Sequence, residues 1–310
     1  MDLFVTTRDL ESAGIQFLII IGSMKSGTSA LFEYLRRHPQ IGTLPKKATD
    51  YFLNNDMSKH DLLEYKAKFD YDPTQHRFAM EASPNYTKLR FKGNCANNIL
   101  NSGIRAKFIY IMRDPIKRIE SQIQHSLDLG WDKPPRKWMR YDPHSADVDD
   151  HMIEPSRYAT QLREYYSRFP GKDILLLKFE DLISEPSRVV AATLDFLHLD
   201  KQLYPGGQFQ VVNSSEQRSS RLPPLIKRVM HFSLMRELTS MAPQSAKTFI
   251  KRLWKKPRNV VRLNEQQREF VLDILQPEIE EIRCRYQFDV SGWECQTPES
   301  TVRASLDLVR

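Results

Sequence analysis

The sequence of 310 residues lacks the features that mark several large classes of protein. Three cysteines are present, Cys95, Cys284 and Cys295; the last two could pair, but three widely spaced thiols are more simply read as reduced. The eight histidines have no metal-ligand spacing, so we predict no metal site. No apolar run approaches the roughly 20 residues of a membrane span. The first residues do not resemble a signal peptide either, so we expect no membrane segment.

Charge and composition narrow the choice of ligand. The net charge of +7 suits an anionic ligand, and it also suits nucleic acid. The basic residues are spread thinly, however, and no zinc-finger or RNA-recognition signature is present. We therefore predict no nucleic-acid partner, and an anionic small molecule or polymer as the ligand.

The stretch from Phe17 to Leu35 has the pattern of a phosphate-binding loop. A continuous apolar run over 17–21 predicts a strand buried on both faces. Gly22 to Gly27 then form a turn, and apolar residues recur at helical spacing from Thr28 onward. In a strand–turn–helix of this kind, free N–H groups and the helix dipole favour an anion. The alternative is a structural turn with a solvated lysine.

The order of residues in this turn separates two kinds of enzyme. ATP-type loops read G-x-x-x-x-G-K-[ST], with the lysine after the second glycine. Here the motif is G-S-M-K-S-G-T-S, and Lys25 lies inside the loop. This resembles the 5'-phosphosulfate loop of sulfotransferases that use 3'-phosphoadenosine 5'-phosphosulfate (PAPS). The resemblance implies a catalytic role for Lys25, and cofactor binding by Lys25, Ser26, Gly27, Thr28 and Ser29.

A second motif lies about ninety residues further on. The apolar run 107–112 predicts a buried strand, and Asp114 is placed to cap the helix that Pro115 begins. The sulfotransferase family uses the same R-D-P-x-x-R-x-x-S pattern to hold the 3'-phosphate of the nucleotide, which implies Arg113 and Ser121 here. The alternative is an ordinary strand-to-helix connection with surface arginines.

The segment 45–52 departs from the family pattern. It resembles the family's K-E-x-x-F-F segment, whose glutamate is the usual general base in the glycan branch. The alignment places Lys47 on the lysine and Ala48 on the glutamate. An alanine cannot accept a proton, so a natural loss, a different base and an engineered knockout all remain open. Asp50 is either a substitute base or a polar loop residue.

Other acceptor-side candidates rest on weaker patterns. Met80 to Tyr86 resembles the family's E-x-S-P-x-Y segment, which implies a role for Glu81 beside the active site. His125 faces either the acceptor or the solvent. The irregular segment 130–156 is predicted to be an acceptor lid, or alternatively an exposed linker. Arg218 is our candidate for the family's late loop over the 3'-phosphate.

The resemblance and the pattern of elements together predict the fold. We expect an α/β protein with a central, mainly parallel sheet flanked by helices, the P-loop-like sulfotransferase fold. One domain is expected over 1–296, followed by a tail over 297–310. Further predicted elements are a strand over 173–179 and helices over 56–76, 187–199 and 264–286.

The predicted function is transfer of a sulfuryl group from PAPS to a hydroxyl or amine of an acceptor, leaving 3'-phosphoadenosine 5'-phosphate (PAP). The acceptor is a glycan, lipid or small molecule, and no magnesium is implied. We expect a cytoplasmic protein, or one of the Golgi lumen if an anchor precedes residue 1. Two alternatives remain: a nucleotide-dependent kinase, and a non-catalytic protein that binds a nucleotide or anion, which Ala48 favours.

Overall fold

The computed structural model describes residues 15–45, 47–54, 59–88, 95–131, 140–206 and 260–294. The chain divides into two compact units, one of residues 1–211 with 262–310 and one of residues 212–261. Apart from two residues, the second unit lies outside the described ranges. The fold described below is therefore that of the first unit, and the single domain expected over 1–296 stays a prediction.

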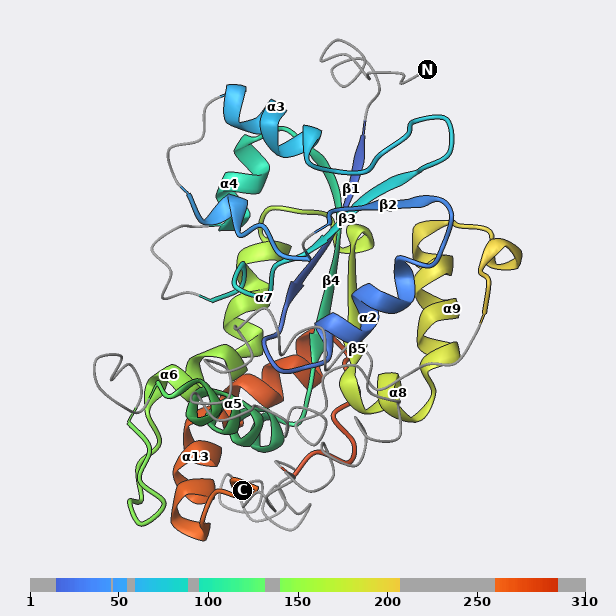
Figure 1. The fold of residues 1–310 in the computed structure, drawn as a ribbon. Coiled ribbons are helices and arrows are strands. Elements are labelled where there is room, and N and C mark those ends of the chain that lie inside the picture. The colour runs from blue at the N-terminus through green and yellow to red at the C-terminus, as the bar shows by residue number, and fades with distance from the viewer. Residues whose placement is uncertain are drawn as a thin grey trace, which may run out of the picture. The chain divides into compact units, whose positions relative to one another are not determined.

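Five parallel strands form the centre of this unit, in the order β2-β3-β1-β4-β5 (Figure 1). The predicted α/β class with a parallel sheet is confirmed. The bounds of the strands are β1 Gln16–Gly22, β2 Ile41–Thr43, β3 Phe78–Ala82, β4 Arg105–Met112 and β5 Ile174–Lys178.

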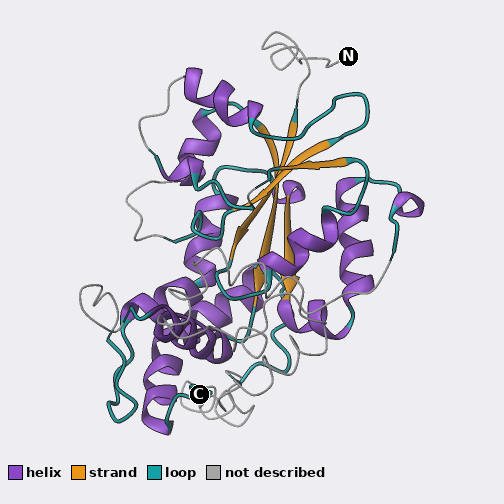
Figure 2. Ribbon diagram, in the orientation of Figure 1, coloured by secondary structure: helices purple, strands orange, loops and turns teal. Residues whose placement is uncertain are grey.

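Helices cover both faces of the sheet (Figure 2). Figure 1 shows α2 and α9 on one face and α3, α4 and α7 on the other. The bounds of the α-helices are α2 Thr28–Leu35, α3 Lys59–Ala67, α4 Cys95–Asn101, α5 Pro115–Leu129, α6 Asp150–Ile153, α7 Tyr158–Tyr166, α8 Phe179–Ser184, α9 Pro186–Leu197 and α13 Glu265–Arg285. Short 3₁₀ turns span Tyr51–Leu53, Glu154–Ser156, Gly171–Asp173 and Lys201–Leu203.

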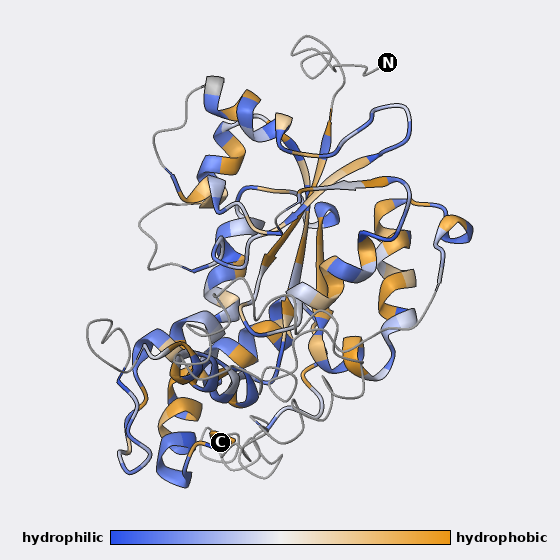
Figure 3. Cartoon of the chain, viewed as in Figure 1, coloured by the Kyte–Doolittle hydropathy of each residue, from blue (hydrophilic) through white to orange (hydrophobic). Residues whose placement is uncertain are grey.

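The central strands are apolar because helices bury both of their faces. Residues 17–21 of β1 and 108–112 of β4 have no solvent-exposed surface. Figure 3 shows these strands as the hydrophobic centre of the fold. An aromatic cluster packs beside β1, where Phe17 stacks on Tyr65 at 5.7 Å and meets Phe69 edge-on at 5.5 Å.

The strand order brings the two predicted nucleotide motifs together. The chain leaves β1 toward β2 and β3 on one side and returns to β4 on the other, which makes the end of β1 a topological switch point. Ligands of open α/β sheets bind at the carboxyl ends of strands at such a point. Gly22 at the end of β1 pairs with Tyr110 of β4, so the loop after β1 and the Arg113 motif after β4 are neighbours.

Two predicted features differ from the structure. The helix expected over 56–76 is described only over α3 and has ended by Ala67. The chain then bends, because Asp70 N–H donates to the Thr43 carbonyl and Asp72 accepts from the Thr74 N–H at 2.8 Å. In addition, β3 was not expected as a strand. Its sequence F-A-M-E-A contains a glutamate, and the structure buries this glutamate completely.

Candidate active site

The loop between β1 and α2 is fastened to the neighbouring strand by Ser23. Its N–H donates to the Ile111 carbonyl at 2.8 Å, and its hydroxyl donates to the same oxygen at 3.1 Å. The Ser23 and Ser26 hydroxyls lie 2.6 Å apart, and both side chains are fully buried. The loop is therefore held on β4 before any ligand binds.

Gly27 ends the loop and is the N-cap of α2. Its φ of 88° lies in the left-handed region, and a Cβ there would come within 2.8 Å of the Phe179 ring. Both observations explain why glycine occupies this position. The first N–H groups of a helix have no intrahelical acceptor, and here they belong to Thr28 and Ser29. The strand, loop and helix expected from the sequence are thus observed, and we call residues 23–29 the cradle; that it binds an anion stays a prediction.

Lys47 reaches this loop from the segment that follows β2. Its Nζ donates to Thr28 Oγ1 at 3.0 Å and to Ser29 Oγ at 2.8 Å. The Lys47 carbonyl accepts from the Ala82 N–H at 3.0 Å, which fixes the backbone beside β3. Burial lowers the pKa of Lys47 to about 8, and the charge of Glu33 partly opposes this. The sequence motif contained Lys47, but nothing in the sequence showed that it contacts the phosphate loop.

The lowered pKa of Lys47 predicts a pH-dependent affinity for anions. An anion beside Lys47 raises its pKa, so binding takes up a proton once the free protein has lost it. We expect the affinity for PAP to fall as pH rises through about 8, by up to about tenfold per pH unit over the first unit or two. Isothermal titration calorimetry from pH 7 to 9.5 measures this. Lys47→Met is the matched control, and an equally steep fall in that variant would assign the effect to another group.

Arg113 lies at the carboxyl end of β4 and faces the same loop. One of its Nη atoms donates to the Lys25 carbonyl at 3.3 Å, and the guanidinium lies 4.5 Å from the centre of the Phe179 ring. Its Nε is shielded from solvent and has no acceptor among the described residues. Burial lowers the pKa of Arg113. A buried donor without a protein acceptor suits an anionic ligand.

The start of α5, directly after Arg113, is held by hydrogen bonds to distant parts of the chain. Asp114 caps α5 by accepting from the Lys117 N–H at 3.1 Å. Its own N–H donates to Glu180 at 3.1 Å, and its second oxygen accepts from the Glu294 N–H at 2.6 Å. Glu180 also accepts from the Trp293 indole at 3.3 Å. We call these residues the Asp114 corner; it fixes the backbone that carries Arg113.

Glu81 lies beneath the segment that carries Ala48. It has no exposed surface and accepts hydroxyl hydrogen bonds from Thr49 at 2.6 Å, Tyr65 at 2.8 Å, Tyr86 at 2.9 Å and Ser83 at 3.3 Å. Burial raises the pKa of the Glu81 carboxyl, although the four hydroxyls lower it. This carboxylate is enclosed by protein, an arrangement that suits holding the 47–50 loop better than taking a proton from an acceptor.

The remaining candidate site residues of the sequence analysis lie on different elements of the structure. Ser121 and His125 are four residues apart on α5, share one face of that helix and are both partly exposed. The His125 ring lies 6.2 Å from the Trp131 ring. Asp50 turns toward Asn85, whose amide donates to it at 3.1 Å, whereas Ala48 is partly exposed. Arg218 lies outside the described residues.

The predicted acceptor lid is only partly irregular. Residues 140–149 contain no helix or strand, and residues 132–139 lie outside the described ranges. The end of the segment differs from the expectation, since α6 and the 3₁₀ turn after it bury Met152, Ile153 and Ser156. These residues belong to the packed body, since α6 and the turn after it pack against α5 and the Ser156 hydroxyl accepts from Arg118 of that helix. The role of the lid stays a prediction.

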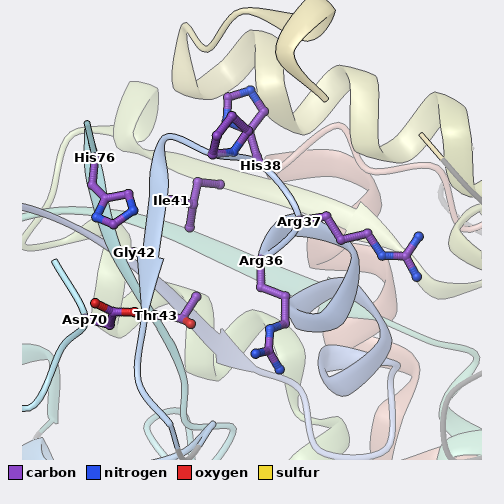
Figure 4. A pocket seen from close by; sticks show the side chains of 9 residues that line it. Arg36, Arg37, His38, Ile41, Gly42, Thr43, Asp70 and His76 are labelled. Carbon is purple, nitrogen blue, oxygen red and sulfur yellow. The ribbon is translucent and has the colours of Figure 1, made fainter. Parts of the chain in front are cut away.

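A separate pocket of about 270 Å³ lies at the other end of α2 (Figure 4). Arg36, Arg37, His38, Asp70 and His76 are among its lining residues. His38 accepts from the Gln40 N–H and donates to the Asp200 carbonyl, so both of its ring nitrogens are used within the protein. No group of side chains within the described ranges is placed to share a metal ion. The length of α2, about 12 Å, separates this pocket from the cradle.

The chain is similar in sequence to known sulfotransferases. A family model described as "Sulfotransferase domain" matches residues 16–232. Human heparan sulfate glucosamine 3-O-sulfotransferase 3B1 is 30% identical over 196 residues, which are 60% of this chain and 48% of that protein. The membrane-associated sulfotransferase kil1 of Dictyostelium discoideum is 35% identical over 111 residues, 35% of this chain and 22% of that protein. The chain thus spans about half the length of the heparan sulfate relatives it matches.

A solved structure agrees with the fold. The sulfotransferase from Alicyclobacillus acidocaldarius superposes with a TM-score of 0.56 at 20% identity, covering 89% of this chain and 97% of that one. In the described part of this chain, every helix is too short or too polar to cross a membrane.

Proposed function

Because the chain belongs to the sulfotransferase family, we propose that it transfers a sulfuryl group from PAPS to a hydroxyl or amine of an acceptor. The observation that carries this proposal is the meeting of two basic side chains at one loop. Lys47 donates to Thr28 and Ser29, and Arg113 donates to the Lys25 carbonyl. Lys47 lies in the loop after β2 and Arg113 directly follows β4, so the fold gathers positive charge at the start of α2.

The residues at this loop fit a nucleotide with two anionic ends. The N–H groups of Thr28 and Ser29, with their hydroxyls and Lys47, would hold the 5'-phosphate. Arg113, with its unused buried Nε–H, would bind the 3'-phosphate together with Ser121. Lys25 would stabilise the negative charge that develops on the leaving oxygen as the S–O bond breaks. Catalysis then consists mainly of alignment and charge neutralisation.

The acceptor we propose is a glycan. The heparan sulfate relatives act on a glucosamine residue by their names, and the net charge of +7 suits an anionic polymer. A glycan of the secretory pathway would place the enzyme in the Golgi lumen, whereas a small-molecule acceptor would place it in the cytoplasm. A screen of acceptors with labelled PAPS decides between these classes.

Nucleotide binding provides the direct test of the donor site. We expect PAP to raise the melting temperature, because a ligand that binds only the folded state stabilises it by roughly 2.7 kcal/mol at 100 times Kd. AMP lacks the 3'-phosphate and should raise it much less. Arg113→Ala should remove most of this difference, since a hydrogen bond to a charged group contributes about 1.5–3 kcal/mol. Differential scanning fluorimetry with both nucleotides measures the shifts.

Arg163 provides the matched control for this test. It lies on α7 and pairs with Glu281 at 3.0 Å, so Arg163→Ala removes a charge without touching the nucleotide motifs. This variant should keep the preference for PAP. Equal shifts with PAP and AMP in the unmodified protein would contradict the assignment of Arg113 and Ser121.

A further inference from the structure

Arg118 is a completely buried arginine on α5, and it lies behind the phosphate loop. It has no exposed surface and is the largest side chain buried to this degree in the described chain. One Nη donates to the Met24 carbonyl of the loop at 3.5 Å and also to Gln122. The other Nη donates to the Met152 carbonyl, and Nε donates to the Ser156 hydroxyl. Every one of these partners is neutral.

The charge of Arg118 is thus buried without an ion pair. In the described ranges no carboxylate lies within ion-pair distance of it, although the charge of Glu154 favours the charged form of Arg118. Burial lowers the pKa of Arg118 to about 10, so the group remains charged at neutral pH. By contrast, Glu120 on the same helix is paired with Arg262 and Arg268. A buried charge without a counter-charge is costly unless an anion is supplied nearby.

Two arginines of one motif hold two consecutive carbonyls of the loop. Arg118 donates to the carbonyl of Met24 and Arg113 to that of Lys25. Each carbonyl oxygen therefore points at a guanidinium group. The N–H group of the same peptide, which is the positive end of its dipole, points away from the arginines. A loop with this polarity suits an anion on its other side.

We propose that Arg118 is a positioning residue for the 5'-phosphate side of the donor site. It turns the Met24 carbonyl away from the bound anion, and that anion supplies a counter-charge that no described carboxylate provides within ion-pair distance. This inference rests on the proposed function. It differs from the family pattern in the sequence, which associates the R-D-P-x-x-R-x-x-S motif with the 3'-phosphate.

The test compares PAP with adenosine 3'-phosphate, which lacks only the 5'-phosphate. Calorimetry measures both dissociation constants for the unmodified protein and for Arg118→Gln, Arg118→Lys and Arg168→Gln. We expect Arg118→Gln to weaken PAP by about tenfold, the scale for one charge near a partly desolvated anion, and to leave adenosine 3'-phosphate nearly unchanged. Arg118→Lys keeps the charge and should keep the preference for PAP.

Arg168→Gln controls for lost stability alone. Arg168 is a partly buried arginine that donates to Asn97 and to the Glu164 carbonyl, and its replacement should not alter the preference. A PAP preference retained in folded Arg118→Gln would overturn the inference. If Arg118→Gln does not fold, the Arg118→Lys variant provides the test. Loss of the preference for PAP in folded Arg118→Lys would also overturn the inference. If the unmodified protein binds neither nucleotide, this result overturns the proposed function and, with it, the inference about Arg118.

Discussion

Replacing Ala48 with glutamate should raise the rate of sulfuryl transfer by roughly 10²–10⁴-fold, the usual contribution of a general base. The position is partly exposed and directly follows Lys47, whose Nζ lies at the donor cradle. A carboxylate placed there would take the proton from the acceptor hydroxyl as the sulfuryl group is transferred. We expect little change in PAP affinity, because position 48 is not among the residues that we propose to hold the nucleotide.

The structure around position 48 supports this expectation. The segment is fixed by hydrogen bonds that do not involve the Ala48 side chain, from Ala82 to the Lys47 carbonyl and from Thr49 to Glu81. A glutamate can therefore be introduced without rebuilding the loop.

Ala48→Gln is the matched control, since it has nearly the same size as glutamate and cannot act as a base. Initial rates with labelled PAPS and the acceptor found by screening measure the effect in all three proteins. If the alanine protein already turns over rapidly and the glutamate variant is no faster, the base lies elsewhere, and Asp50 and His125 are then the residues to replace. Tight PAP binding without transfer by any of the three would favour the non-catalytic alternative.

Removing Lys25 should have the next largest effect. In the Ala48→Glu background, Lys25→Ala should lower kcat by roughly 10²–10³-fold, the range seen when a group that stabilises developing charge is removed. The affinity for PAP should fall much less, because the strongest contact of Lys25 forms only as the leaving oxygen gains charge.

The backbone conformation at Lys25 does not favour one replacement of this lysine over another. Its φ is 73°, so alanine and glutamine bear a similar backbone strain to lysine at this position. Lys25→Gln, which keeps a long side chain without the charge, should lose as much activity as Lys25→Ala. Steady-state kinetics give kcat, and calorimetry with PAP gives the affinity. Unchanged turnover in both variants would show that the loop assignment is wrong.

The sequence predicted the fold well where a strand or helix is defined by its own residues. The continuous apolar runs at β1, β4 and β5 gave strands close to the observed bounds. The final helix was expected over 264–286 and is observed over 265–285, because Asn264 and Gln267 form a complete capping box. The resemblance to sulfotransferases is confirmed by the family match over 16–232.

The sequence did not show features that depend on neighbours distant along the chain. Glu81 was a candidate for catalysis, but four hydroxyls enclose it, two from other segments and two from its own. The contact of Lys47 with Thr28 spans nineteen residues, and that of Arg118 with Met24 spans ninety-four. An isolated lysine or arginine in a sequence has no pattern that distinguishes such contacts from a solvated surface.

The Asp114 corner is completed only late in the synthesis of the chain. The bond from the Glu294 N–H to Asp114 joins residues 180 positions apart, and Lys178 at the end of β5 reaches Asp289 across 111 positions. At about 5–20 residues per second, a ribosome needs about 9–36 s between making the two ends of the first contact. During that interval β4 can already pair with β5, but the bond from the Glu294 N–H to Asp114 cannot yet form. The backbone that carries Arg113 therefore receives its last hydrogen bond in the Asp114 corner only after residue 294 has been made.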